Sequence, residues 1–253
     1  MEISTQYRDD VGWIIFDRPE SRNAISKSMW EQIPIALQNL KEQGARICIF
    51  RGASGVFASG ADLAELVQID SKEKATEQWL SIRDALNAVA AFDLPVLAMI
   101  EGPCMGGGCL LAAACDLRFC LANAKFSVPV ALLGIKLDDD NVARILSLIG
   151  KASTLDMLLT GRVFDAQQAL QIGLVNGVAD DVGGLDALLQ NACADIKRNA
   201  PSALAHIKET VRKLAPQCHD QEQQAMVDSY LSPEFRARVS RALDKSKKPG
   251  PSH

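Results

Sequence analysis

Short apolar runs alternate with amphipathic stretches through the first half of this 253-residue chain. Four of the apolar runs predict strands. They are residues 11–16, 46–51, 95–100 and 116–121. Apolar positions at helical spacing predict helices at 27–41 and 71–91. Strands that alternate with helices favour a sheet built through right-handed crossovers, so the expected fold class is α/β.

After residue 141 the pattern becomes almost wholly helical, with stops at Gly173 and at Gly183 and Gly184. Helices are expected at 141–149, 153–159, 166–172, 185–198, 202–214 and 222–231, with Pro233 opening the last one. We therefore predict a core over residues 1–200, followed by a helical C-terminal region over residues 201–253.

A glycine triplet, residues 106–108, joins the apolar run that ends at Ile100 to the helix-forming residues 110–114. Glycine lets a ligand approach the backbone closely, and the first N–H groups of a helix have no partner inside it. A second loop, residues 57–63, also follows an apolar strand and opens a helix. Two converging backbone N–H groups could therefore form an oxyanion hole.

The order and spacing of these loops resemble the crotonase (enoyl-CoA hydratase/isomerase) superfamily, and the resemblance runs through most of the chain. It rests on residues 17–25, 57–63, 100–109, 124–127, 158–166 and 169–175. It implies a spiral of ββα units, a helical C-terminal region that forms a homotrimer or hexamer, and an acyl-CoA substrate. It places the two oxyanion N–H groups on Ala61 and Gly107.

The same resemblance implies that coenzyme A enters as part of the thioester, with no permanently bound cofactor. Its contacts are expected at Arg22, Ala24 and the run Ala61, Asp62, Leu63 and Ala64. Leu66, Leu110 and Val130 are assigned to the substrate pocket, and Trp79 and Ile82 fit either that pocket or the core. Phe235, Lys245 and Lys247 resemble C-terminal residues that close the coenzyme A site.

Two glutamates hold the water in hydratases of this family, and here their positions carry Leu110 and Val130. Neither side chain can transfer a proton, and each general acid or base is worth about 10²–10⁴-fold in rate. Efficient hydration by the usual route is therefore not expected.

Three aspartates, residues 138–140, are the remaining candidates for a base. In the dienoyl-CoA isomerase branch an aspartate follows the second glutamate position by eight residues, and Asp138 follows Val130 by eight. That branch also carries acidic residues at the positions of Leu110 and Val130, so the match is partial. Asp138 is either a catalytic base or a helix-capping residue, and Asp139 is the next candidate. A helix start near Val142 would make Asp140 or Asn141 the cap.

Three further carboxylates lie near the glycine loops. Asp62 is expected to cap a helix, Glu65 could face the acyl pocket, and Glu101 is expected to be structural. The three histidines all lie in the C-terminal fifth of the chain, away from both loops, and no metal-ligand spacing is present.

Composition and charge exclude some classes of binding partner and indicate a cellular compartment. A net charge of −4 argues against a nucleic-acid groove, and no apolar run approaches the ~20 residues of a membrane span. Seven cysteines, mostly in apolar patterns, and a polar opening unlike a signal peptide predict a cytoplasmic protein with reduced thiols.

Two functions remain open at this point. The chain is either an acyl-CoA enzyme of isomerase, lyase, decarboxylase or hydrolase type that stabilises a thioester enolate in a backbone hole, or a catalytically silent acyl-CoA binding or scaffold protein. Retention of both oxyanion loops favours the enzyme.

Overall fold

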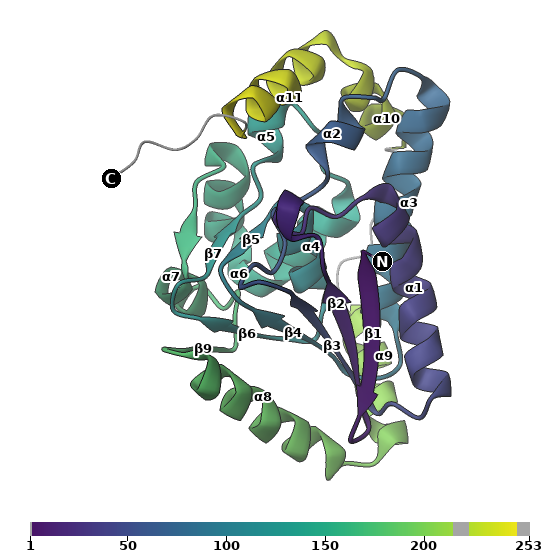
Figure 1. Ribbon diagram of the computed structural model, residues 1–253, viewed down its shortest axis with the longest axis vertical. Helices are drawn as coiled ribbons and strands as arrows, with labels where there is room; N and C mark the ends of the chain where they lie inside the picture. Colours follow the sequence, from purple (N-terminus) through teal and green to yellow (C-terminus); the bar gives the residue numbers. More distant parts are fainter. Residues whose placement is uncertain (1, 215–222, 247–253) are drawn as a thin grey trace.

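The computed structural model describes residues 2–214 and 223–246. A six-stranded sheet has the strand order β1-β2-β3-β4-β6-β9, and a smaller sheet has the order β5-β7-β8 (Figure 1). The larger sheet contains β1 (Ile3–Arg8), β2 (Val11–Phe16), β3 (Ile47–Gly52), β4 (Val96–Ile100), β6 (Leu117–Leu121) and β9 (Gly177–Ala179). The smaller one contains β5 (Pro103–Met105), β7 (Lys125–Ser127) and β8 (Phe164–Asp165).

The helices flank these sheets and account for most of the second half of the chain. They are η1 (Pro19–Ser21), α1 (Lys27–Glu42), α2 (Leu63–Leu66), α3 (Lys72–Ala91), α4 (Gly107–Ala114), α5 (Val130–Leu133), α6 (Asp139–Thr160), α7 (Ala166–Gln171), α8 (Val182–Lys197), α9 (Pro201–Leu214), α10 (Gln223–Leu231) and α11 (Pro233–Ser246). The four predicted strands and the long predicted helices are all present, with ends shifted by a few residues. No helix in the described ranges is both long and apolar enough to cross a membrane.

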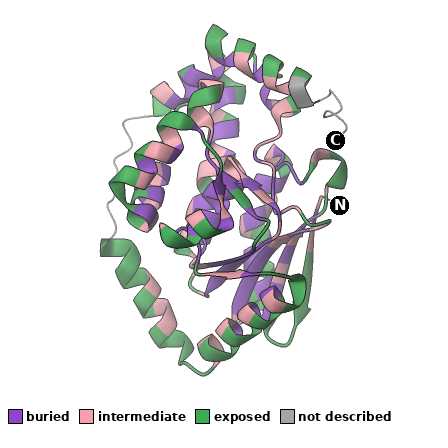
Figure 2. Cartoon of the chain, turned by 90° about the vertical axis from the view of Figure 1, so that its left-hand side faces the viewer, coloured by how far each residue is buried: buried purple, intermediate pink, exposed green. Residues whose placement is uncertain are grey.

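The strands β2, β3, β4 and β6 of the larger sheet are covered on both faces, which explains why they read as continuous apolar runs. From β2 to β9 all neighbouring strands are parallel, and only β1 pairs antiparallel. Phe50 and Ala98 belong to the core shared with α1, α3 and α4, whereas Ile49 and Leu97 belong to the core covered by α8. Figure 2 shows the buried strands and the exposed outer faces of the helices.

The C-terminal helices behave in two ways. α10 and α11 fold back on the same chain, where Met226, Tyr230 and Phe235 join a core cluster with Leu66 and Trp79. α9 instead buries none of its residues, and Ile207, Val211 and Leu214 on it are 58%, 64% and 81% exposed. α10 and α11 therefore complete a core of their own chain, and the packing of the C-terminal region on neighbouring copies stays a prediction.

The helical segments predicted at 141–149 and 153–159 form one element, α6, with a kink. Gly150 has φ 70° and ψ 169°, a conformation outside the helical region that glycine adopts readily. The kink separates the two segments, as the sequence pattern indicated.

Candidate active site

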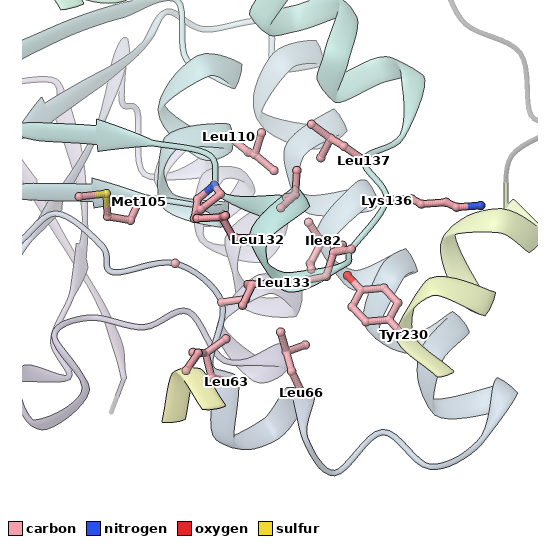
Figure 3. Close-up of a pocket in the computed structure, with 18 of the residues that line it drawn as sticks. Leu63, Leu66, Ile82, Met105, Leu110, Leu132, Leu133, Lys136, Leu137 and Tyr230 are labelled. Carbon is pink, nitrogen blue, oxygen red and sulfur yellow. The ribbon is translucent and has the colours of Figure 1, made fainter. Parts of the chain in front are cut away.

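A cavity of about 510 Å³ lies between the glycine loops, α2, α3, the segment 129–141 and the helices α10 and α11. Its wall is largely apolar, with Leu63, Leu66, Ile82, Leu110 and Leu133 among the side chains that line it (Figure 3). A concave, mostly apolar cavity with a few convergent polar groups is the usual form of a small-molecule site.

The two loops predicted to converge are in backbone contact at one wall of this cavity. A Cβ built on Gly106 would lie 3.6 Å from Gly60 Cα, and one built on Gly107 would lie 3.6 Å from Ala61 N. Gly106 has φ 49° and ψ −120°, which a residue with a side chain rarely adopts. In the described part of the chain, neither the Ala61 N–H nor the Gly107 N–H has a hydrogen-bond partner. Two neighbouring donors, both at the cavity, are therefore free for a ligand.

Close packing around the triplet explains why it is made of glycine. A Cβ on Gly107 would lie 2.9 Å from Trp30 Cζ2, and one on Gly108 would lie 2.6 Å from the Cβ of Ala58. Backbone hydrogen bonds hold the loops together, from Met105 N to Ala58 O at 2.9 Å and from Ala58 N to Pro103 O at 3.1 Å. The donors are thus fixed in place before any ligand arrives, which is what an oxyanion hole requires.

The first loop is also anchored to the predicted coenzyme A segment. Ile25 N donates to Gly60 O at 2.8 Å, and Asp62 N donates to Ile25 O at 3.2 Å. Asn23 is buried, and its amide donates to Ala53 O and Val56 O. Arg22 has φ 54° and is exposed, Ala24 is buried, and Ala64 is exposed.

Arg118 fixes the far end of α4 and was missed by the sequence reasoning. It is 3% exposed and donates to Ala112 O, Cys115 O and Leu174 O. A cation at a helix C-terminus interacts favourably with the helix dipole. Arg118 therefore holds the helix whose opposite end carries the Gly107 donor.

Leu110 and Val130, at the hydratase glutamate positions, both line the cavity, as does Leu66. All three predicted pocket residues are therefore cavity residues, together with Trp79 and Ile82. At Leu110 and Val130 the wall offers no group that could bind or activate water.

Asp138 both lines the cavity and caps α6. Its Oδ1 accepts from Asn141 N at 2.9 Å, and its Oδ2 accepts from Asn141 Nδ2 at 3.0 Å. The expectation that Asp140 or Asn141 caps this helix is wrong, because the helix begins at Asp139 and the Asp138 side chain accepts from the backbone N–H of Asn141. One residue thus both caps the helix and lines the cavity.

A second layer of polar groups supports Asp138. Arg144 donates to Asn141 Oδ1 at 2.9 Å and also contacts Asn87 Oδ1. Burial lowers the pKa of Arg144, while the carboxylates of Asp140 and Asp138 act in the opposite direction. This network, which spans α3 and α6, could not be read from local sequence patterns.

The other carboxylates have structural partners. Asp62 caps α2 through Ala64 N at 2.9 Å, as expected, and pairs with Arg18 at 3.0 Å. Glu65 does not line the cavity, contrary to the suggestion that it faces the acyl pocket, because its carboxylate accepts from Lys27 N at 2.7 Å at the start of α1. Glu101 lies 3.7 Å from Arg51, and Asp139 is not among the cavity residues.

The predicted C-terminal contacts are corrected in part. Phe235 is fully buried in the cluster formed by α10 and α11, so its ring is not free to close over a ligand. Lys247 lies outside the described residues, and so does the side chain of Lys245. The cavity residues from this region are Met226, Tyr230, Arg238, Arg241 and Ala242.

The six cysteines of the described residues are buried and free, in line with the expected reduced thiols. Burial raises the pKa of Cys48, Cys115 and Cys120 to about 12, which keeps these thiols protonated at neutral pH. The described ranges also hold no group of three or more His, Cys, Asp or Glu that could bind a metal ion.

Comparison with known proteins gives a consistent assignment. The family described as enoyl-CoA hydratase/isomerase matches residues 6–243. A peroxisomal Delta(3,5)-Delta(2,4)-dienoyl-CoA isomerase of Arabidopsis thaliana is 31% identical over 221 residues, 82% of this chain and 80% of the relative. A 2,3-dehydroadipyl-CoA hydratase of Escherichia coli is 31% identical over 216 residues, 83% of this chain and 81% of the relative.

The fold agrees with solved structures. An enoyl-CoA hydratase/carnithine racemase from Magnetospirillum magneticum superposes with a TM-score of 0.80 at 30% identity, covering 98% of this chain and 94% of that one. The chain therefore belongs to the enoyl-CoA hydratase/isomerase family and has the crotonase fold.

Proposed function

We propose that this protein is an acyl-CoA enzyme that stabilises a thioester enolate in the backbone hole formed by Ala61 and Gly107. The observation that carries the proposal is the pair of unpartnered N–H groups at the wall of an apolar cavity. Donors fixed in advance toward a developing oxyanion are commonly the largest single contribution to catalysis.

The reaction class we infer is a proton shift within the acyl chain. The thioester oxygen accepts hydrogen bonds from both N–H groups, and the Asp138 carboxylate removes a proton from carbon. The electron pair left on carbon becomes the enolate, with its negative charge on the bound oxygen. Return of the proton to another carbon of the conjugated chain moves the double bond without adding or losing an atom.

The absence of proton-transfer groups at Leu110 and Val130 favours this class over hydration. Similarity to a protein named a dienoyl-CoA isomerase supports the same choice. Similarity to a named hydratase keeps hydration as a reaction to measure.

Coenzyme A is proposed to enter only as part of the substrate. Its contacts would be Arg22, Ala24 and the segment 61–64. Hydrogen bonds of Ile25 join the first segment to the first oxyanion loop, and Ala61 and Leu63 line the cavity. We further propose a homotrimer or hexamer, because α9 leaves an apolar face exposed. We also propose a cytoplasmic location, which the free, buried cysteines of the described residues support.

The second candidate is a catalytically silent acyl-CoA binding or scaffold protein. The two are separated by incubation with a panel of acyl-CoA thioesters in deuterated water, followed by mass spectrometry. Exchange of a carbon-bound proton for deuterium, without addition of water, requires removal of that proton and supports the enzyme. Binding with neither exchange nor turnover across the panel would reject it in favour of the scaffold.

A further inference from the structure

Tyr230 is a buried tyrosine whose hydroxyl group points into the cavity. Its ring lies on α10 and packs edge to face on Phe235, with ring centroids 5.5 Å apart and an interplanar angle of 87°. The residue is 4% exposed, so the ring has little freedom to turn the hydroxyl elsewhere. Figure 3 shows this hydroxyl directed toward Ile82 and Leu133 inside the cavity.

The hydroxyl group has no hydrogen-bond partner within residues 2–214 and 223–246. The hydroxyl group faces the cavity, and a ligand that covers it without offering an acceptor costs free energy, because the donor then loses its hydrogen bonds to water. Burial raises the pKa of Tyr230, and the charge of Asp138 raises it further, so the group remains a donor at neutral pH. A purely hydrocarbon acyl chain would leave this cost unrelieved.

The position of Tyr230 indicates which part of a substrate it would meet. In Figure 3, Met105, next to the glycine triplet, and Tyr230 lie on opposite sides of the cavity. A thioester carbonyl held at the glycine loops would therefore place the more distant part of the acyl chain near Tyr230.

The surroundings also restrict the charge of the acceptor. Asp138 lines the same cavity, and a second carboxylate beside it would be repelled. Among the described residues, three cations also line the cavity: Lys136, whose side chain extends away from the other labelled side chains in Figure 3, Arg238, which is paired with Glu234 at 2.7 Å, and Arg241. The charge that acts on the Tyr230 hydroxyl group is that of Asp138. An uncharged oxygen, on a hydroxyl or a keto group, fits these surroundings best.

We propose that Tyr230 is a specificity-determining residue that donates a hydrogen bond to an uncharged oxygen on the acyl chain, remote from the thioester. The substrate class is then an acyl-CoA with a hydroxyl or keto group on its chain. This inference rests on the proposed acyl-CoA function and adds the kind of acyl chain that the substrate carries.

The test compares Tyr230→Phe with the wild-type chain by titration calorimetry. The ligands are sets of saturated acyl-CoA thioesters of equal carbon number, unsubstituted or with a hydroxyl, keto or terminal carboxylate group at successive positions. Tyr230→Phe keeps the ring and its contact with Phe235 and removes only the donor. Tyr7→Phe, an identical change at an exposed position on β1, is the matched control.

At least one hydroxy- or keto-acyl-CoA is expected to bind wild-type protein about tenfold more tightly than its unsubstituted counterpart. Tyr230→Phe should remove that gain without weakening the binding of the unsubstituted thioester, whereas Tyr7→Phe should retain the gain. Three results would overturn the inference: wild-type protein that shows no preference for a hydroxyl or keto group, a gain in affinity that survives Tyr230→Phe, or the largest gain in affinity with a carboxylate. If unsubstituted acyl-CoA binds normally in those cases, the proposed function stands; if no acyl-CoA binds, both fail.

Discussion

Replacement of Asp138 by asparagine separates the two roles that the structure assigns to one side chain. Asparagine is as good an N-cap as aspartate, so its side-chain oxygen can still accept from Asn141 N, at 2.9 Å in the native protein. The carboxylate charge is lost, and the favourable interaction with the helix N-terminus falls by about 0.3–1 kcal/mol. The variant should therefore fold with nearly native stability.

The catalytic effect should be much larger than the effect on stability. Loss of a general base costs about 10²–10⁴-fold in rate, because the amide cannot accept the carbon-bound proton. Exchange of acyl-chain protons in deuterated water measures the rate, and urea unfolding measures the stability. Asp138→Ala is the comparison variant, and it should lose the cap as well, at about 1 kcal/mol.

Two results would refute this reasoning. Full exchange activity in Asp138→Asn would mean that Asp138 serves only as a helix cap, and Asp139 would be the next carboxylate to replace. A large loss of stability in Asp138→Asn would mean that the charge, rather than the cap, holds the start of α6. Retained acyl-CoA binding with lost exchange is the outcome that we expect.

Three further predictions follow from other parts of the molecule. Hydration of a short 2-enoyl-CoA should be at least about 10²-fold slower than in a relative with both glutamates. The loss of ultraviolet absorbance of the enoyl-CoA measures this rate, and a comparable rate would contradict the role given to Leu110 and Val130. Arg118→Ala should destabilise the fold by roughly 2–5 kcal/mol in urea unfolding, because three buried carbonyl groups lose a charged donor, and an unchanged midpoint would show that α4 does not depend on it. Light scattering at micromolar concentration should give the mass of three or six chains, and Val211→Glu should reduce it if α9 forms the contact; a wild-type monomer would exclude that assembly.

The sequence predicts those features that depend on local patterns. The strands that became β2, β3, β4 and β6 are continuous apolar runs because both faces of the sheet are covered. Asp62 is recognisable as a cap because it directly precedes a helix that begins after a glycine loop. The two loops are recognisable because each follows a strand and opens a helix.

The remaining features depend on contacts between distant segments. Tyr230 lies on α10, beside the segment that carries Asp138. The hydrogen bond from Lys136 N to Ser229 Oγ, at 3.3 Å, joins that segment to α10. No local periodicity reports a contact across 93 residues. β5 and β7, of three residues each, are too short to give an alternating pattern. The start of α6 was placed late because three consecutive aspartates can each act as a cap.

The central claim is that backbone donors at Ala61 and Gly107 stabilise an enolate, and the Gly107 donor can be removed with a matched control. Gly107 is the first residue of α4, a position that proline favours, so Gly107→Pro removes the N–H while remaining compatible with the helix. Gly107→Ala adds the same Cβ near Trp30 but keeps the N–H.

The decisive measurement is the rate of acyl-proton exchange in deuterated water for wild type, Gly107→Ala and Gly107→Pro, with the best-bound acyl-CoA. Loss of one oxyanion donor should slow exchange in Gly107→Pro by about 10²–10³-fold relative to Gly107→Ala. Equal exchange rates in the proline and alanine variants, with both folded and binding the thioester, would contradict the claim that this N–H holds the enolate oxygen.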